Sequence, residues 1–296
     1  MVSSLFSNFW LAVIRSVNCE FEKAGAHMAR ALEINMAANS NWGVSVIKSN
    51  LSYFIHFFNG RVKKSHQTSS EALEGANESG DIFSKAMASV CHGISCYGRG
   101  FFDDATSHLT EGCKFCEKIK LVVFHGLAHF FLGEAYLEIR NFKKAEDNYN
   151  QAIQILERNR IIPSWINVSR SAIIRLKAIS NAPVVDLETV LSYAENNKAK
   201  IWDGWIYRNI AEILLNIDEQ GLTEAENWIN KAIESDTSNG TFLNLGRAYA
   251  LYAELCQRKG EHRNAMSALK KAIAVFKECG SDGFLMRAEQ SLASIG

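Results

Sequence analysis

Proline is almost absent from this chain, with two in 296 residues. Because proline breaks helix interiors, so low a content suits a chain that is helical almost throughout. An excess of charge of one sign is lacking too, since 32 basic residues balance 32 acidic ones. Nucleic-acid binding depends on clustered Lys and Arg side chains. The composition therefore offers no electrostatic basis for a nucleic-acid partner.

Cysteine is present without a disulfide pattern. The chain has seven cysteines, an odd number, and they are scattered. This usage is typical of free thiols in a reducing compartment. The apolar stretch Leu5–Val17 contains Arg15, lacks a basic leading segment and a small-residue cleavage site, and is too short to cross a bilayer. We therefore predict a buried helix there, no membrane partner and a cytoplasmic location.

Motifs that bind nucleotides or position a catalytic nucleophile are missing. The sequence contains no G-x-x-x-x-G-K-[ST] phosphate loop, no G-x-G-x-x-G and no G-x-S-x-G elbow. Ser, His and Asp are too common here for a triad to be chosen without geometry. We predict no catalytic residue and no cofactor, and we expect that the protein is not an enzyme.

The chain does contain a repeat. Pairs of small residues seven positions apart recur about every 40 residues, and only Leu187 departs from the small-residue rule. The pairs are Ala24/Ala31, Ser65/Ala72, Ala105/Gly112, Ala145/Ala152, Leu187/Ala194, Ala225/Ala232 and Ala265/Ala272. A fixed period of this length is the signature of a solenoid. The small residues allow two helices to approach closely, while bulky neighbours fill the space beside them.

The clearest copy of the repeat lies within residues 126–152. Two sets of residues at helical spacing define it: Leu132, Gly133 and Tyr136 on a first helix, and Ala145, Tyr149 and Ala152 on a second. The break between them is short enough for a tight helix–helix turn. Five residues before the first small residue, three copies have Gly60, Gly100 or Gly260. We expect these glycines to adopt the positive φ that ends a helix.

The pattern Leu-Gly-x-x-Tyr, followed by an aromatic residue, Ala, Tyr and Ala, resembles the tetratricopeptide repeat, and the resemblance covers essentially the whole chain. The period is near 40 rather than the usual length of about 34 residues. The long form resembles repeats of the bacterial maltose-regulon activator family, and those in bacterial signalling proteins that join a cyclase, kinase or NTPase module to such an arm. HEAT and armadillo repeats share the longer period and are the alternative, although we would expect more proline in them.

The expected fold is an all-α, right-handed superhelical solenoid of about seven helix pairs, forming one domain over residues 1–296. The predicted repeats cover residues 5–40, 46–80, 86–120, 126–160, 165–198, 202–236 and 244–279, and a capping helix covers 283–295. The unit around Leu187 is the least regular, because it lacks the small residue and because Pro163 and Pro183 lie at its helix boundaries.

The first helix of each repeat lines the concave face of such a solenoid, where partners bind. The resemblance assigns to that face Phe9, Asn50, Phe54, Phe57, Tyr97, Phe130, Glu134, Arg208, Glu212, Arg247, Glu254 and Arg258. The face would be aromatic toward the N-terminus and charged toward the C-terminus. Two interpretations stay open for the aromatic part: a groove that receives a partner's amphipathic helix, or residues that simply pack between repeats because the longer helices shift the register.

The resemblance implies protein–protein interaction rather than catalysis. The expected setting is the sensor or regulatory arm of a larger bacterial signalling or transcription-regulating protein. The alternative is a free-standing adaptor, similar to a co-chaperone, that binds a partner helix or peptide. An upstream domain of the same polypeptide is a candidate partner, because the first repeat begins within five residues of Met1 without a polar capping helix. Neither the identity of the partner nor the oligomeric state follows from the sequence.

One group of residues has the composition of a metal site. Cys113-x2-Cys116 is followed by His125-x3-His129, and these residue types bind zinc. The segment between the two pairs is shorter than the spacing of about 12 residues in zinc fingers. In the repeat frame the cysteines end a second helix, where free cysteine commonly acts as a small hydrophobic residue. We expect structural packing and keep a zinc-binding protein as the alternative.

Overall fold

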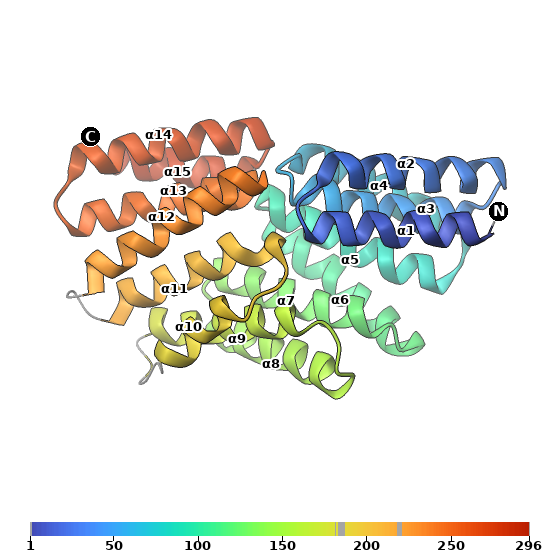
Figure 1. Cartoon of the computed structure of the whole chain (residues 1–296), viewed down its shortest axis with the longest axis horizontal. Helices are drawn as coiled ribbons and strands as arrows, with labels where there is room; N and C mark the ends of the chain where they lie inside the picture. Colours follow the sequence, from blue (N-terminus) through green and yellow to red (C-terminus); the bar gives the residue numbers. More distant parts are fainter. Residues whose placement is uncertain (1, 181, 183–186, 218–220, 296) are drawn as a thin grey trace.

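The computed structural model describes residues 2–180, 182, 187–217 and 221–295, with side chains from residue 7 onward. Over these residues the chain is all-α (Figure 1). The first helices of the pairs are α1 (Val2–Val17), α3 (Asn41–Asn50) with the π-helical η1 (Leu51–Phe57), α5 (Ile82–Arg99), α7 (Val122–Glu138), α9 (Pro163–Ile179), α11 (Asp203–Ile217) after the 3-10 turn η2 (Lys200–Trp202), and α13 (Phe242–Arg258). The second helices are α2 (Phe21–Ala37), α4 (Val62–Ser79), α6 (Phe102–Ile119), α8 (Phe142–Arg158), α10 (Leu187–Glu195), α12 (Leu222–Asn239) and α14 (His262–Cys279), and α15 (Asp282–Ile295) follows the last pair. The predicted fold class is confirmed.

The small residues that mark the period lie where the two helices of a pair touch. Every member of these pairs is buried except Leu187 and Ala194, which are half-buried. The contact between α5 and α6 is especially close, since a Cβ added at Gly112 would lie 2.6 Å from a methyl carbon of Val90. A larger side chain at such a position would push the helices apart.

The turns between paired helices follow the predicted chemistry where glycine is present. Gly60, Gly100 and Gly260 have φ values of 73°, 78° and 75°, which confirms the expectation from sequence. At Gly100 the left-handed conformation lets two backbone N–H groups, its own and that of Phe101, return to carbonyl groups at the end of α5, at 2.8 and 2.9 Å. These bonds end the helix and direct the chain into α6.

The fifth pair departs most from the repeat. Its second helix, α10, has nine residues, and Val190 is the one residue that it buries. Pro163 occupies the first turn of α9, where a missing backbone donor has no cost. Pro183 lies outside the described residues. A short helix that buries little surface fits the loss of the small anchor at position 187.

The first helix, α1, is helical as predicted but is not buried all round. Ala12 and Ser16 are buried, whereas Trp10, Leu11 and Ile14 are 58%, 40% and 56% exposed. The expectation of a buried helix over Leu5–Val17 was therefore wrong for one face, which no other helix of the described residues covers. Among the described residues, no helix combines the length and apolar character needed to cross a bilayer.

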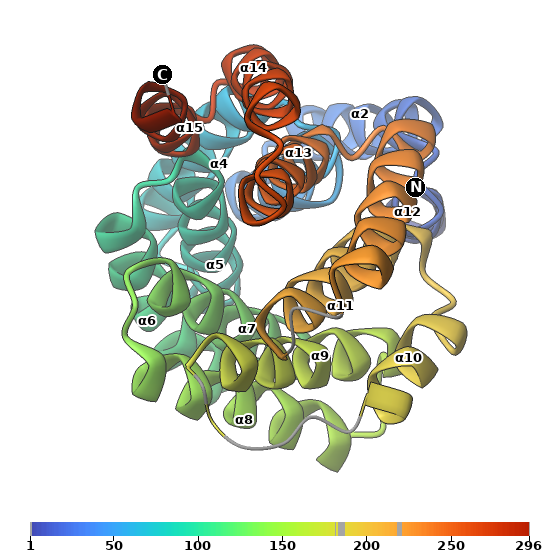
Figure 2. The same cartoon turned by 90° about the vertical axis from the view of Figure 1, so that its left-hand side faces the viewer.

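The stack of repeats curves back on itself, so that its last helices lie beside its first ones (Figure 2). Asn59, between η1 and α4, donates a hydrogen bond of 3.2 Å to the carbonyl oxygen of Gly240, between α12 and α13. Arg99 at the end of α5 forms an ion pair with Asp282 at the start of α15. The superhelix is therefore closed by direct contacts between residues far apart in the sequence, and its inner face is enclosed.

Candidate functional site

The aromatic part of the predicted partner-binding set lies inside the fold. Asn50, Phe54, Phe57, Tyr97 and Phe130 are all buried, and Phe9 on α1 is half-buried. A buried ring has no surface to offer to a second molecule. Their placement corresponds to the interpretation in which these residues pack between repeats, and an open aromatic groove is not formed by them.

These rings are held together by Phe131 of α7, which the sequence pattern did not single out. Its ring centroid lies 5.5 Å from the centroids of Phe57 and Tyr97 and 5.9 Å from that of Trp205, each in a near-perpendicular arrangement. Edge-to-face contacts of this kind add to the stabilisation from burying the ring area. One side chain of the fourth pair thus joins the second, third and sixth pairs.

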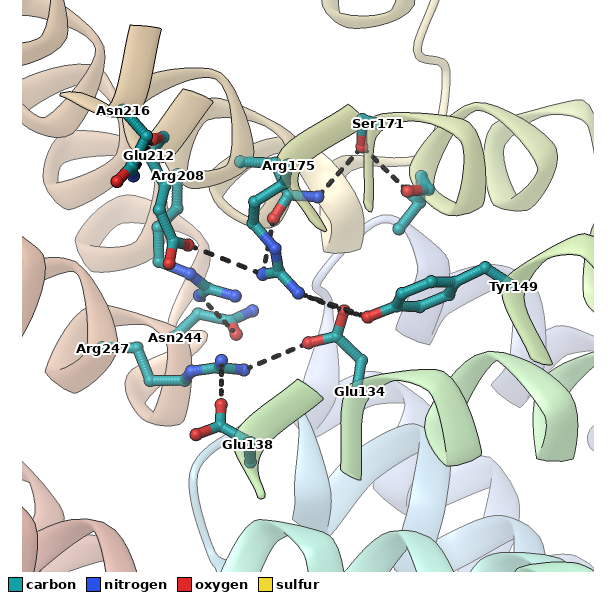
Figure 3. A network of polar contacts seen from close by, with 12 residues as sticks. Glu134, Glu138, Tyr149, Ser171, Arg175, Arg208, Glu212, Asn216, Asn244 and Arg247 are labelled. Carbon is teal, nitrogen blue, oxygen red and sulfur yellow. Dashed lines mark hydrogen bonds and ion pairs between the residues drawn. The ribbon is translucent and has the colours of Figure 1, made fainter. Parts of the chain in front are cut away.

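Glu134, also in the predicted set, is fully buried one turn further along α7 and is the centre of a polar network (Figure 3). The hydroxyl group of Tyr149 and Nη2 of Arg175 each donate to its Oε1 at 2.7 Å, and the hydroxyl group of Tyr97 donates to Oε2 at 3.3 Å. Burial alone would raise the pKa of Glu134, but the charges of Arg175 and Arg247 outweigh burial and hold the pKa below its ordinary value. Glu134 is therefore an ionised anchor for the interior.

Arg175 of α9 is the second member of this network and is likewise almost fully buried. Its Nη1 donates to Oδ1 of Asn209 at 2.9 Å and lies 3.8 Å from a carboxylate oxygen of Glu212. The amide of Asn209 in turn donates to Oγ of Ser171 at 2.9 Å. One weak signal in the sequence indicates Arg175, since it is a basic residue within the mainly apolar segment 171–179.

Arginines from the last repeat and from the final helix reach across the interior to α7. Nη2 of Arg247 donates to Oε1 of Glu138 at 2.6 Å, and Nη1 of Arg287 donates to Oε2 of the same residue at 2.7 Å. Arg247 also donates to the hydroxyl group of Tyr97. The carboxylate of Glu138 thus binds two guanidinium groups that lie more than a hundred residues away in sequence. Arg287 was absent from the predicted set, which contained no residue of the capping helix.

Arg208 of α11 differs from the other buried arginines, since no acidic group pairs with it among the described residues. Its Nη1 donates to the neutral Oδ1 of Asn244 at 3.3 Å, and its Nη2 is buried without a hydrogen-bond partner in the described part of the chain. The guanidinium carbon lies 5.2 Å from the ring centroid of Trp205. Burial, together with the nearby charges of Arg247 and Arg175, lowers the pKa of Arg208 to about 10. Within the described residues, the site therefore contains a buried cation that forms no ion pair.

A cleft of about 360 Å³ opens beside these groups on the inner face of the superhelix. Its polar lining consists of Glu138, Arg208, Glu212, Arg247, Glu254, Gln257, Arg287 and Ser291, and its apolar lining includes Leu251, Leu269, Phe276 and Phe284. Four residues of the predicted partner-binding set thus come together here, from α11 and α13. Arg258, the last member of that set, is exposed and forms an ion pair with Glu254.

Three of the four candidate zinc ligands also come together. The ligand atoms of Cys113, His125 and His129 all lie within 4.8 Å of one another, between α6 and α7. Cys116 is fully buried and does not belong to this group. Oδ1 of Asn148 lies 2.9 Å from Nδ1 of His129, while its amide nitrogen donates to a backbone carbonyl. His129 therefore carries a proton on Nδ1, and its Nε2 lone pair is available to a metal.

Residues 127–156 and 246–279 match the family model of the tetratricopeptide repeat. These two segments coincide with the pairs α7–α8 and α13–α14. No curated protein matches the sequence. The chain therefore contains tetratricopeptide repeats at these two helix pairs.

Solved structures with low sequence identity share the fold. The apo form of RapI is 14% identical, with 92% of this chain and 97% of RapI covered and a TM-score of 0.61. A Rap protein complexed with Competence and Sporulation Factor is 11% identical, with coverages of 99% and 76% and a TM-score of 0.53. A Signal Transduction ATPase with Numerous Domains (STAND) from Pyrococcus horikoshii, described with a tetratricopeptide repeat sensor, is 16% identical, with coverages of 96% and 44% and a TM-score of 0.50.

Proposed function

We propose that this chain is a protein-interaction scaffold, and that a short polypeptide segment with charged side chains binds in the cleft between α7, α11, α13 and α15. The observation that carries the proposal is the lining of the cleft, where charged side chains from four helices surround an apolar floor. A few convergent polar groups over an apolar surface are typical of ligand sites.

The chemistry of the lining indicates what such a segment carries. Glu254 and Arg287 are 47% and 42% exposed at the cleft. The guanidinium group of Arg287 can bind a carboxylate of the ligand by a charge-assisted hydrogen bond. A ligand with at least one acidic group and an apolar side chain satisfies both parts of the lining. The Rap neighbour with a bound factor supports an interaction role for this fold.

Selection from a displayed library of random peptides on the immobilised full chain tests this proposal. We expect enriched peptides rich in acidic and apolar residues. Their affinity should rise at least tenfold on Glu254→Lys, because that change replaces a carboxylate on the exposed side of the cleft by an ammonium group that attracts acidic side chains. Glu111→Lys, an equal change of charge at an exposed position on the outer helix α6, is the matched control.

Two results would contradict the proposal. One is a library that yields no enriched sequence. The other is a set of enriched peptides that bind the wild type, the Glu254→Lys variant and the Glu111→Lys variant equally well, since their site would then lie outside the cleft.

The proposed setting is the sensor or regulatory arm of a larger bacterial signalling protein in the cytoplasm. The open face of α1, with Trp10, Leu11 and Ile14, supports docking of another domain of the same polypeptide, since exposed apolar patches mark interaction sites. All cysteines described are free thiols, which suits a reducing compartment. The native reading frame upstream of Met1 tests the setting: an NTPase, cyclase or kinase module would support it, and a stop codon would favour the free-standing adaptor.

Zinc binding by Cys113, His125 and His129 is a second candidate function, favoured by the convergence of their ligand atoms. Three protein ligands leave one position of a tetrahedral zinc ion open. Equilibrium dialysis of the chelator-treated full chain against Zn²⁺ tests it, with Cys113→Ser as the variant. Retention of all bound zinc by that variant would argue against this candidate.

A further inference from the structure

A second group of metal-binding side chains lies between α4, α5 and α6. The ligand atoms of His66, His92 and Cys96 all lie within 4.8 Å of one another. His92 and Cys96 are four residues apart on α5, so they project from the same face of that helix. His66 comes from α4 and faces them. Three donor groups from two helices thus converge without any contribution from the cleft.

His108 of α6 also packs against His92. The ring centroids of His92 and His108 are 4.6 Å apart, and those of His66 and His92 are 4.9 Å apart. Nδ1 of His108 is buried and has no hydrogen-bond partner among the described residues. A buried nitrogen of this kind is costly unless something binds it. Coordination of a metal ion between these rings would remove that cost.

The surroundings of His92 hold its ring in an orientation suited to a ligand. Oγ of Ser69 lies 3.0 Å from Nδ1 of His92 and 2.8 Å from Oγ of Ser95. If His92 carries its proton on Nδ1 and donates it to Ser69, its Nε2 lone pair is left for a metal. Histidine ligands in metal sites are commonly fixed by a hydrogen bond of this kind on the other ring nitrogen.

We propose that His66, His92, Cys96 and His108 bind one Zn²⁺ ion, which links α4, α5 and α6. Imidazole nitrogen and thiolate sulfur are the preferred ligands of zinc, and four of them complete a closed structural site. Bond lengths of about 2.0–2.3 Å place tetrahedral ligand atoms about 3.3–3.8 Å apart, so a shift of roughly 1 Å closes the arrangement of His66, His92 and Cys96. His108 lies outside that 4.8 Å group and has to move further to become the fourth ligand. The thiol of Cys96 gives up its proton to solvent when the S–Zn bond forms.

This site is distinct from that of Cys113, His125 and His129, since it shares no residue with it. The two groups lie in successive layers of the stack, one centred on α5 and the other on α7. A zinc titration must therefore measure them separately. Substitutions within each group can distinguish the two sites, and a histidine that belongs to neither group provides a control.

Isothermal titration of the chelator-treated full chain with Zn²⁺ tests the proposal. We expect His66→Gln to lower the affinity for one equivalent of zinc at least tenfold, because His66 is half-buried and its loss removes a ligand with little loss of packing. His66→Cys, which keeps a zinc-binding group, should restore binding. His27→Gln is the matched control, since His27 has the same place in the first repeat as His108 in the third, and bonds to Asn8 instead.

Co²⁺ provides the second measurement, because a thiolate–cobalt bond absorbs strongly in the near ultraviolet. In the Cys113→Ser variant the proposed site retains Cys96 as its thiolate, so this absorption should persist there and vanish on addition of Cys96→Ala. The proposal is overturned if the absorption is missing in Cys113→Ser, or if His66→Gln binds zinc like the wild type. The far-ultraviolet circular dichroism of each variant confirms that the chain remains folded.

Discussion

Phe131 and Glu134 are both fully buried, one turn apart on α7, and their surroundings are opposite in kind. Phe131 lies among rings from the second, third and sixth pairs, whereas Glu134 lies among arginines and tyrosine hydroxyl groups from the third, fourth, fifth and seventh. Aromatic rings can pack against each other at many angles. Each hydrogen bond to Glu134, in contrast, requires a donor group at one defined position. The same helix therefore joins its neighbours by apolar packing on one turn and by directional charge pairing on the next.

The difference teaches how the inner face is divided. Apolar packing stabilises in proportion to buried area and leaves no polar group for a ligand. The charged region keeps Arg208 unpaired and places Glu138, Glu212 and Arg247 beside an open cleft. We therefore expect a ligand to bind in the charged region, and we expect both regions to stabilise the fold. Variants that remove one region at a time test this division.

The largest effect is expected from the aromatic region. Replacement of Phe54 and Phe57 by Ser should abolish the helical circular dichroism signal, because each loss of a buried phenylalanine costs about 3–5 kcal/mol and the sum approaches the stability of a typical domain. The control is Phe83→Ser with Phe101→Ser, two rings that are more than a third exposed. A Phe54/Phe57 variant that stays folded would mean that these rings form a binding groove after all.

A smaller but still severe effect is expected from the charged region. Glu134→Gln should lower the free energy of unfolding by about 3–5 kcal/mol, because it removes the fully buried carboxylate that pairs with the buried Arg175. Urea denaturation measures the change, with the exposed Glu111→Gln as control. Since the pKa of Glu134 lies below its ordinary value of 4.5, its contribution is present above that value and is lost as the pH falls through the lower pKa of the folded state. A midpoint equal to that of the wild type would show that the network does not stabilise the fold.

The smallest effect concerns Asp236, a buried acid that forms no ion pair within the described residues. Thr241 donates to its Oδ1 at 2.6 Å, while Oδ2 has no hydrogen-bond partner there. Burial raises its pKa from 3.8 to about 7, because the hydrogen bond of Thr241 and the charge of Arg208 do not compensate. The folded state thus retains a proton that the unfolded state releases, and Asp236 makes stability fall as the pH rises from about 4 to 7.

The slope from one such proton is at most about 1.4 kcal/mol per pH unit. Asp236→Asn should remove this slope, and urea midpoints measured across the interval for both proteins check it. Asp203 also lies near Asp236 and has a raised pKa, so Asp203→Asn is the necessary comparison. An unchanged slope in Asp236→Asn, with a reduced one in Asp203→Asn, would reassign the effect.

Much of the fold follows from local spacing. The small residues predicted the paired helices because close helix contact is repeated in every unit, and Gly100 predicted its turn because a positive φ is a local requirement. The irregular pair around Leu187 was also visible, since it lacks the small anchor. Each of these features depends on residues within one repeat.

Closure of the superhelix was not predictable in this way. It depends on the small rotation between successive repeats, summed over the whole chain, and no single repeat contains that sum. The register placed Phe57 and Tyr97 on the inner face, but closure decided that this face would be covered. The sequence pattern did not identify Arg175 and Arg287 as site residues for a related reason. The acidic partner of each lies in another helix pair, so the pattern within one repeat does not contain it. Of the two interpretations left open for the aromatic residues, closure corresponds to packing in the core, and it leaves the charged cleft as the candidate site.

The closing contacts have a consequence for folding. In an open solenoid each repeat contacts only its neighbours, and stability is close to a sum of local terms. Here Asn59 bonds to Gly240 and Arg99 pairs with Asp282, across 181 and 183 residues of sequence. Contacts between residues so far apart raise the contact order, which slows folding, and they couple the loss of the last repeat to that of the second and third. This protein should thus unfold as one cooperative unit, without the gradual fraying from one end that linear repeat arrays allow.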